Sequence, residues 1–183
     1  PRLILSVPLV IEKIYKKRVL PKISSNPVKT LLKIPLLNNI VYKKIRKQLF
    51  EAFGGNFKEI VIGGAPFNPD AEDLFKKIKL PFSVGYGMTE CGPLISYIGW
   101  ETTKLRSAGK IVDTLEIRID SEDPYHISGE IQVRGENVML GYYKNESATK
   151  EILDNEGWLH TGDLGIIDKE NFVFIRGRNK SML

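Results

Sequence analysis

The sequence predicts a mixed α/β fold, in which part of a doubly wound α/β subdomain (residues 1–104) is followed by a β-rich, barrel-like subdomain (residues 105–183). Two observations predict it. A strand, a helix and a second strand follow one another between residues 59 and 84, the pattern of a parallel βαβ unit. After about residue 104, apolar residues alternate with polar ones, as they do in half-buried antiparallel strands.

The composition is that of a globular protein, because 42% of the 183 residues are hydrophobic and 27% are charged. The single cysteine, Cys91, excludes an intrachain disulfide scaffold. The apolar run from Leu3 to Ile11 is nine residues long, whereas a membrane-spanning helix needs about 20. We also expect no signal peptide, and therefore a cytoplasmic protein.

The charges are unevenly distributed along the chain. Residues 1–50 contain twelve Lys or Arg and a single acid, Glu12, whereas residues 51–183 contain 15 bases and 21 acids. Three accounts of the basic part remain open: a solvated lysine-rich helix face, peripheral contact with an anionic membrane surface, and steering of CoA. We expect no nucleic-acid partner, because no recognition motif accompanies the charge.

Two helices and a connector are predicted before the βαβ unit. Apolar residues recur at helical spacing over residues 9–19, and Pro21 is expected to end that helix. The proline-containing segment from Ile23 to Leu37 is expected to be a connector. A second helix is expected from Asn38 to the stop signal Gly54-Gly55.

The βαβ unit ends each of its strands in a glycine-rich turn. The strand Glu59–Ile62 leads into Gly63–Pro66, and a helix begins at Asn68. The second strand, Phe82–Val84, leads into Gly85–Gly87. Because ligands bind at the carboxyl ends of parallel strands in open α/β sheets, both turns are candidate parts of a site.

The β-rich region is predicted to contain antiparallel strands and one short helix. Leu115–Ile119 and Glu130–Arg134 alternate with a period of two residues. The helix is expected at Asn145–Leu153, and a hairpin is expected to join Leu164–Ile167 to Phe172–Ile175.

The segment Gly85–Glu90 contains three side chains suited to a nucleotide. The Tyr86 ring offers a flat face to a purine, the Thr89 hydroxyl can reach a phosphate oxygen, and the Glu90 carboxylate can hold Mg²⁺. The alternative interpretation is a glycine turn with a capping threonine and a solvated glutamate.

Two later segments carry weaker signals of the same kind. Asp163, which follows Gly162 at the expected end of a loop, can accept hydrogen bonds from two vicinal ribose hydroxyls, although an isolated aspartate is more commonly a turn residue before a strand. The basic residues of Arg176–Lys180 could contact a ribose or a phosphate, or could simply form a surface turn. We expect Cys91 and Trp158 to have packing roles and His160 to shape its loop or act in acid–base chemistry.

Together these segments resemble the adenylate-forming superfamily of acyl- and aryl-CoA synthetases, luciferases and peptide-synthetase adenylation domains. Six motifs occur in the family's order, namely Gly63–Pro66, Gly85–Glu90, Gly129–Gly135, Gly141–Lys144, Trp158–Asp163 and Gly177–Lys180. Within the superfamily, Ser6-Val7-Pro8 with Glu12–Lys16 resembles long-chain fatty acyl-CoA synthetases, although Leu9 stands where an arginine usually follows.

The resemblance implies nucleotide-binding positions at Gly64, Ala65, Pro66, Gly85, Tyr86, Gly87, Thr89, Asp163 and Arg178. By similarity, residues 64–66 would line the adenine and one wall of the acyl pocket, and Tyr86 would stack on the base. Asp163 would hold the ribose hydroxyls, and Arg178 would add a ribose or phosphate contact.

By the same resemblance, Thr89 and Glu90 would be the catalytic residues, Glu90 would bind Mg²⁺, and Lys180 would be the hinge to a C-terminal domain.

The resemblance implies an AMP-forming ligase that uses ATP, Mg²⁺ and coenzyme A to activate a fatty acid, with a long-chain acid as the first hypothesis. The family's phosphate loop and its catalytic C-terminal lysine have no counterpart here, so we expect an excised part of a longer enzyme, inactive alone. The alternatives are an aryl-CoA ligase, a carrier-protein-loading adenylation domain and a non-catalytic nucleotide-binding module.

Overall fold

The computed structural model describes residues 1–32 and 34–178, which form two compact units. Unit 1 consists of residues 1–83 and 99–101, and unit 2 consists of residues 84–98 and the chain from residue 102 onward. Parallel strands in unit 1 and antiparallel sheets in unit 2 confirm the predicted mixed α/β class. The expected domain boundary at residue 104 stays a prediction.

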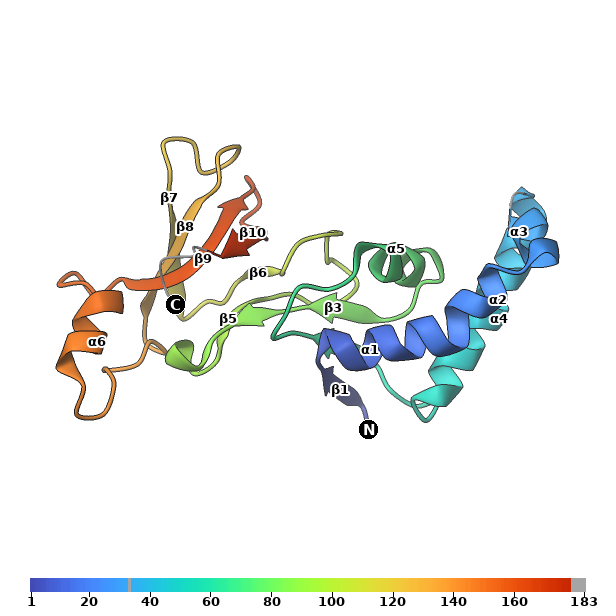
Figure 1. Cartoon of the computed structure of the whole chain (residues 1–183), viewed down its shortest axis with the longest axis horizontal. Coiled ribbons are helices and arrows are strands. Elements are labelled where there is room, and N and C mark those ends of the chain that lie inside the picture. Colours follow the sequence, from blue (N-terminus) through green and yellow to red (C-terminus); the bar gives the residue numbers. More distant parts are fainter. Residues whose placement is uncertain (33, 179–183) are drawn as a thin grey trace. The chain divides into compact units, whose positions relative to one another are not determined.

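Unit 1 contains a three-stranded sheet in the order β1–β2–β3, with bounds Leu3–Ser6, Glu59–Ile62 and Phe82–Val84 (Figure 1). Strands β2 and β3 lie where the sequence predicts them, and helix α5 (Pro69–Lys77) connects them. Strand β1, which pairs in parallel with β2, was not predicted. Its positions alternate between exposed and half-buried, but Leu3, Ile4 and Leu5 are all apolar, so the sequence does not show that alternation.

Helix α5 has favourable groups at both ends. The Asn68 side chain accepts a hydrogen bond of 3.0 Å from the Ala71 N–H, which caps the first turn. Acidic residues occupy that turn and lysines occupy the last one, as the helix dipole favours. The buried ring of Phe75 contacts Phe67 and Phe82, with centroids 5.8 and 5.5 Å away, and so joins the helix to β3.

The helices that precede β2 differ from the prediction. They are α1 (Pro8–Ile14), η1 (Tyr15–Val19), α2 (Leu20–Ile23), α3 (Asn26–Leu32) and α4 (Pro35–Ala52). The expected helix end at Pro21 is wrong, because Pro21 lies in the first turn of α2. The expected connector at Ile23–Leu37 is also wrong, since it contains α3 and the start of α4. Proline is tolerated in a first helical turn, where its missing N–H has no intrahelical acceptor.

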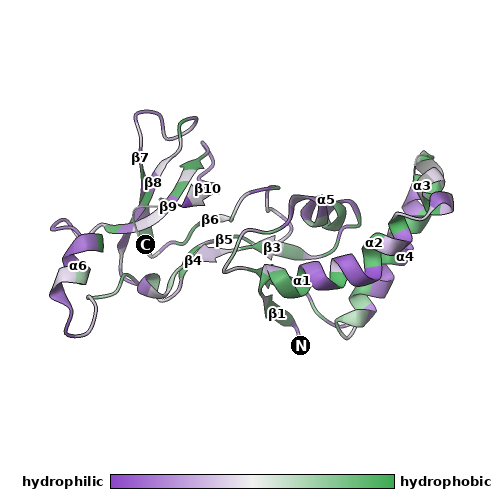
Figure 2. Cartoon of the chain, in the orientation of Figure 1, coloured by the Kyte–Doolittle hydropathy of each residue, from purple (hydrophilic) through white to green (hydrophobic). Residues whose placement is uncertain are grey.

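The helical part of unit 1 is amphipathic, as Figure 2 shows by the hydrophilic and hydrophobic bands that alternate along α1, α2 and α4. Its buried face contains Ile11, Val19, Ile45 and Leu49, each at most 5% exposed. Helix α4 ends at the predicted position, because Gly54 and Gly55 adopt the left-handed φ values of 91° and 70°. None of the described helices is long and apolar enough to cross a membrane.

Unit 2 contains two antiparallel sheets and a short helix. One sheet pairs β4 (Tyr86–Gly87), β5 (Leu94–Tyr97) and β6 (Lys110–Ile111). The other has the order β10–β9–β8–β7, with bounds Val173–Arg178, Leu159–Ile167, Gly129–Gly135 and Leu115–Asp120. Helix α6 (Glu146–Ile152) and the β9–β10 hairpin confirm the predicted elements.

The core of unit 2 is apolar and continuous across its sheets. Its fully buried members are Cys91, Ile95, Ile131, Val133, Leu159 and Val173. Tyr86 and Met88 are half-buried against this cluster, so the segment that carries the predicted nucleotide residues rests on a packed core.

Candidate nucleotide-binding site

The segment Gly85–Glu90 continues directly from β3 and forms the edge strand β4 and then the short 3₁₀ turn η2 (Thr89–Cys91). Thr89 is exposed, whereas Tyr86 and Glu90 are half-buried. Gly87 is needed because a Cβ atom there would lie 1.9 Å from the carbonyl oxygen of Pro93. The glycine thus serves a close approach of two backbone segments.

Tyr86 and Asp163 meet although they are 77 residues apart. The Tyr86 hydroxyl donates a hydrogen bond of 2.7 Å to Oδ2 of Asp163. The guanidinium Nε of Arg178 lies 3.7 Å from Oδ1 of the same carboxylate. The structure therefore brings three predicted residues into one cluster within unit 2.

Strand pairing explains how Arg178 reaches Asp163. The two residues are opposite one another in the antiparallel pair of β10 and β9. Asp163 was expected at the end of a loop, and this is wrong, because β9 begins at Leu159 and includes Asp163. The side chain of Asp163 is 19% exposed and that of Arg178 is 69% exposed, so Arg178 reaches the carboxylate from the solvent side.

The cluster is arranged to accept hydrogen bonds from a ligand. Burial raises the pKa of Tyr86 well above its ordinary value, and the hydrogen bond and charge of Asp163 raise it further. The hydroxyl consequently remains protonated and donates, while the carboxylate keeps acceptor capacity for hydroxyl groups. An aromatic ring beside such a carboxylate suits a base joined to a ribose.

Neighbouring groups in the sheet hold the backbone of Asp163. Its N–H donates to Oγ1 of Thr161 at 3.1 Å, and this buried hydroxyl donates to the carbonyl of Ile131 at 2.7 Å. The N–H of Gly162 donates to Oε1 of Glu130 at 3.1 Å. Glu130 thus satisfies an amide in the residue next to Asp163, a role that sequence reasoning did not detect.

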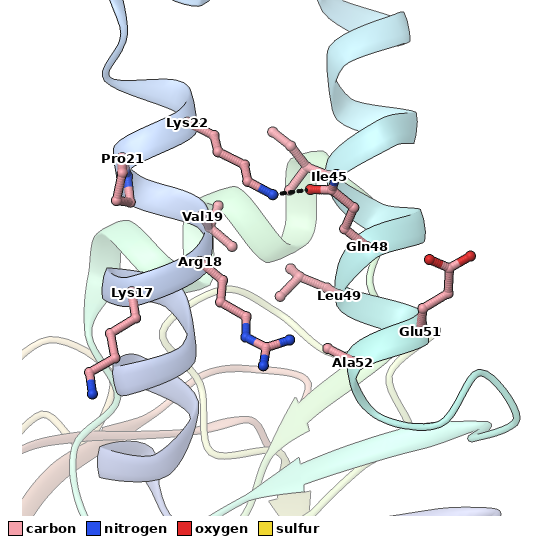
Figure 3. Close-up of a pocket in the computed structure, with 10 residues that line it drawn as sticks. All are labelled: Lys17, Arg18, Val19, Pro21, Lys22, Ile45, Gln48, Leu49, Glu51 and Ala52. Atoms are coloured by element: carbon pink, nitrogen blue, oxygen red, sulfur yellow. Dashed lines mark hydrogen bonds between the residues drawn. The ribbon is translucent and has the colours of Figure 1, made fainter.

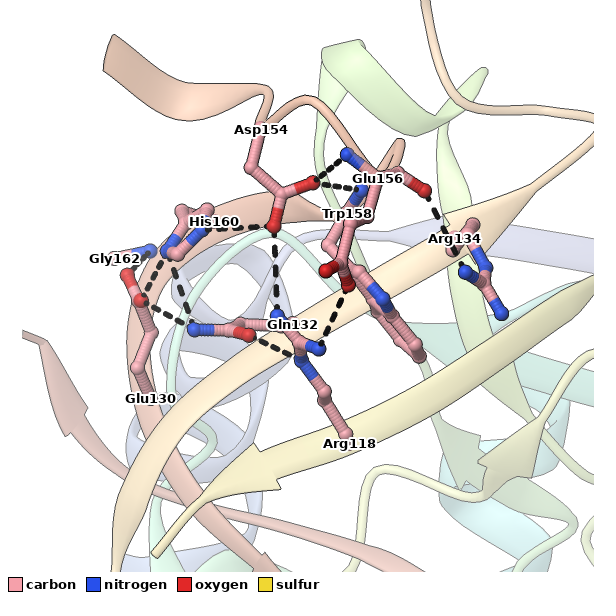
Figure 4. A network of polar contacts seen from close by, with 9 residues as sticks. All are labelled: Arg118, Glu130, Gln132, Arg134, Asp154, Glu156, Trp158, His160 and Gly162. Atoms are coloured by element: carbon pink, nitrogen blue, oxygen red, sulfur yellow. Dashed lines mark hydrogen bonds and ion pairs between the residues drawn. The ribbon is translucent and has the colours of Figure 1, made fainter.

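His160 belongs to the polar network of Figure 4. Its Nδ1 lies 2.7 Å from Oε2 of Glu130, and its Nε2 lies 3.8 Å from Oδ2 of Asp154. Both ring nitrogens thus have carboxylate neighbours, which supports a structural role, but the expected loop position is wrong because His160 lies in β9. Trp158 is 7% exposed, and the guanidinium groups of Arg118 and Arg134 lie 4.3 and 4.6 Å from its ring centre, which supports a packing role.

Glu90 is the predicted Mg²⁺ ligand, and its Oε1 accepts a hydrogen bond of 2.6 Å from the hydroxyl of Tyr142. This hydrogen bond, followed by burial and the charge of Glu90, raises the pKa of Tyr142 to about 12. Within the described residues, no cluster of three or more His, Cys, Asp or Glu side chains could hold a metal ion. A single half-buried carboxylate nevertheless fits Mg²⁺ of the kind bound by one or two carboxylates, substrate phosphates and water.

The other predicted site residues are not placed in this cluster. Gly64, Ala65 and Pro66 are exposed in the loop that follows β2 in unit 1, where Gly64 has a left-handed φ of 87°. Whether they join the cluster of unit 2 stays a prediction. The expected hinge, Lys180, lies outside the described residues.

Two surface cavities lie away from the predicted positions. In unit 1, a cavity of about 640 Å³ lies between η1–α2 and α4, where Lys22 donates a hydrogen bond of 2.6 Å to Gln48 (Figure 3). In unit 2, an open depression of about 790 Å³ is lined in part by Arg118, Asp154 and His160. Neither is lined by a residue of the predicted nucleotide site.

Comparison with known proteins shows the family to which the chain belongs. The family model described as AMP-binding enzyme matches residues 1–143. The chain belongs to the AMP-binding enzymes.

The chain is also similar to individual CoA ligases and synthetases, in sequence and in structure. The 4-coumarate–CoA ligase 1 of Oryza sativa subsp. japonica is 40% identical over 137 residues, which cover 68% of this chain and 24% of that protein. A double mutant of o-succinylbenzoate CoA synthetase from Bacillus subtilis, bound to a product analogue, has a TM-score of 0.70 and 26% identity over 97% of this chain and 31% of its own.

The same synthetase in complex with ATP and magnesium ion has a TM-score of 0.67 and 28% identity, over 96% of this chain and 31% of its own. The present chain therefore spans about a quarter to a third of the length of these AMP-binding enzymes.

The reactivity of Cys91, which follows Glu90 in the chain of this AMP-binding enzyme, can be predicted from its burial. Its thiol is fully buried, and burial, followed by the charge of Glu90, raises its pKa to about 11 from an ordinary 9.0. At pH 8 we expect iodoacetamide to alkylate it at least about a hundredfold more slowly in the folded chain than in urea. Mass spectrometry checks this unambiguously because the chain has one cysteine.

Equal alkylation rates in the folded and unfolded chain would contradict the buried placement. The raised pKa of Cys91 also predicts how the stability of the folded chain depends on pH. Since the unfolded thiol ionises first, the free energy of unfolding is expected to fall as the pH rises from 9 to 11.

Proposed function

We propose that this chain supplies the adenosine-binding part of an AMP-forming acid–CoA ligase. The observation that carries the proposal is the cluster of Tyr86, Asp163 and Arg178, in a chain that belongs to the AMP-binding enzymes. Relatives whose names include CoA ligase or CoA synthetase support the reaction class. A related structure that contains ATP and magnesium ion supports these as the nucleotide and the metal.

In the proposed reaction, the carboxylate of the acid attacks the α-phosphorus of ATP and forms an acyl-adenylate, while pyrophosphate leaves. The thiol of CoA then attacks the acyl carbon, and AMP leaves. Because the acid is already an anion, the first step requires no general base. Catalysis depends on alignment and on neutralising the charge on phosphorus.

Each predicted side chain has a defined role in this proposal. In the cluster, the Tyr86 ring stacks on adenine, the Asp163 carboxylate accepts hydrogen bonds from the ribose hydroxyls, and Arg178 adds a ribose or phosphate contact. Outside the cluster, the exposed Thr89 hydroxyl donates to a phosphate oxygen, and Glu90 would hold a Mg²⁺ ion, which would supply positive charge to the phosphates.

Two classes of acid substrate are each supported by a separate observation. The acids named for the relatives, 4-coumarate and o-succinylbenzoate, both contain a benzene ring, which supports an aromatic substrate. The similarity of Ser6-Val7-Pro8 to long-chain synthetases supports a long-chain fatty acid. We propose the aromatic acid as the first candidate, because the similarity of the relatives extends over most of the chain.

ATP–pyrophosphate exchange tests the proposal in the complete ligase that contains this chain. We expect exchange that depends on an added acid, with aromatic acids more active than fatty acids of graded length. The isolated 183 residues are expected to show none, because this chain has no counterpart of the family's phosphate loop or C-terminal lysine. AMP binding to the complete ligase, measured by calorimetry, is the control.

Each alternative gives a different result. Exchange that increases with fatty acyl length would favour the long-chain class. AMP binding without exchange, whichever acid is added, would favour a non-catalytic nucleotide-binding module. Acyl transfer to a carrier protein in place of CoA would favour a carrier-loading adenylation domain.

A further inference from the structure

Tyr142 makes a contact that the proposed function does not yet explain. Its hydroxyl donates to Oε1 of Glu90 across 52 residues of sequence, at 2.6 Å. The Tyr142 side chain remains 39% exposed, so water competes for the same carboxylate oxygen. Such an exposed hydrogen bond persists only where the backbone on both sides is already fixed.

The backbone near Tyr142 is fixed to the Glu90 turn. The N–H of Met139 donates to the carbonyl of Glu90 at 2.8 Å. The Asn137 side chain donates to the carbonyls of Cys91 and Leu94 at 2.7 and 3.0 Å. These three hydrogen bonds hold residues 137–142, which we call the brace, against the turn.

Helix α6 fixes the other end of the brace. The N–H of Tyr142 donates to Oγ1 of Thr149 at 2.9 Å, and this hydroxyl donates to the carbonyl of Asn145. A Cβ atom on Gly141 would lie 2.9 Å from the Thr149 methyl group, so the close approach requires glycine.

We propose that Tyr142 is a positioning residue for the Glu90 carboxylate. Its hydroxyl holds Oε1 in one orientation and would thereby leave Oε2 available to a bound cation. The proposal rests on the proposed function, in which Glu90 binds the metal. It adds the brace and α6 to the parts of unit 2 that determine metal affinity. Without the Tyr142 hydroxyl, the Glu90 carboxylate rotates freely, and its affinity for the cation is lower.

The test compares Tyr142→Phe with Tyr143→Phe in the complete ligase. Both variants lose one hydroxyl, but Tyr143 is 87% exposed and belongs to neither the brace nor the site. Binding of Mn²⁺ in the presence of ATP, measured by electron paramagnetic resonance, reports on the metal without turnover. The Mg²⁺ concentration for half-maximal ATP–pyrophosphate exchange is the second readout.

We expect Tyr142→Phe to weaken Mn²⁺ binding and to raise the Mg²⁺ requirement by about tenfold, the effect of one hydrogen bond to a charged group. AMP affinity in EDTA should stay unchanged, and Tyr143→Phe should match the wild type. Thr149→Val, which removes the acceptor for the Tyr142 N–H and the donor to the Asn145 carbonyl, should shift metal binding in the same direction by a smaller factor. It serves as the second variant if Tyr142→Phe folds poorly.

Unchanged or tighter Mn²⁺ binding in Tyr142→Phe would overturn the positioning role, because tighter binding would mean that Tyr142 competes with the metal. A wild type that binds AMP but no Mn²⁺ with ATP would also overturn it, while the adenosine site would stand. A wild type that binds no AMP would instead overturn the proposed function.

Discussion

Replacing Asp163 with alanine is expected to weaken AMP binding about a hundredfold. The substitution removes the carboxylate that accepts a hydrogen bond of 2.7 Å from the Tyr86 hydroxyl. The Nε atom of Arg178 lies 3.7 Å from Oδ1 of the same carboxylate. It also removes two hydrogen bonds proposed for the ribose, each made to a charged acceptor. Such bonds contribute about 1.5 kcal/mol or more apiece, and together they correspond to a factor of about a hundred in Kd.

Calorimetry with AMP and 2′-deoxy-AMP checks the mechanism as well as the affinity. The wild type should prefer AMP, whereas Asp163→Ala should bind both nucleotides equally weakly. Tyr86→Phe keeps the ring and the carboxylate, so it should lose less affinity and keep the preference for AMP. Asp120→Asn, which alters an exposed carboxylate of the same sheet, serves as the control. A preference for AMP that survives in Asp163→Ala would refute the ribose role.

Replacing Gly87 with alanine is expected to destabilise unit 2 by about 3 kcal/mol or more. The added Cβ would lie 1.9 Å from the Pro93 oxygen, a contact that only a backbone shift can relieve. Gly87 pairs with Leu94, so the shift would disrupt the β4–β5 pair. Tyr86 and Glu90, on either side of it, would then move relative to Asp163 and Tyr142.

Urea denaturation of the chain, followed by circular dichroism, measures this loss. Gly177→Ala is the matched control, since a Cβ there meets no atom within 4 Å in the same unit. It should change the free energy of unfolding by less than about 0.5 kcal/mol. Equal stabilities for the two variants would show that the β4–β5 turn has room for a side chain.

Elements that depend on local chemistry could be predicted from the sequence. Helix α5 begins where Asn68 and Pro69 indicate, and α4 ends where Gly54 and Gly55 indicate. The same local rules gave the wrong result at Pro21. A proline marks a helix boundary without telling whether the chain turns away or begins a new helical segment, and here the next segment continues.

Parts of the site that depend on distant partners could not be predicted from local patterns. Gly162-Asp163 resembles a turn, and Gly162 does have a left-handed φ of 70°, yet β9 includes both residues because Asp163 pairs with Arg178 of β10. Tyr142 belongs to a family motif, but its hydrogen bond to Glu90 becomes evident only in three dimensions. The family motifs did identify Tyr86, Asp163 and Arg178, which the structure brings together.

The long sequence separation of these contacts has a consequence during synthesis. Tyr86 leaves the ribosome 77 residues before Asp163, an interval of about 4 to 15 seconds at ordinary elongation rates. Throughout this interval Asp163 is not yet present to accept the hydrogen bond from the Tyr86 hydroxyl. The proposed nucleotide therefore cannot guide the early folding of unit 2 through this pair, and we expect it to stabilise the unit only after β9 has joined the sheet.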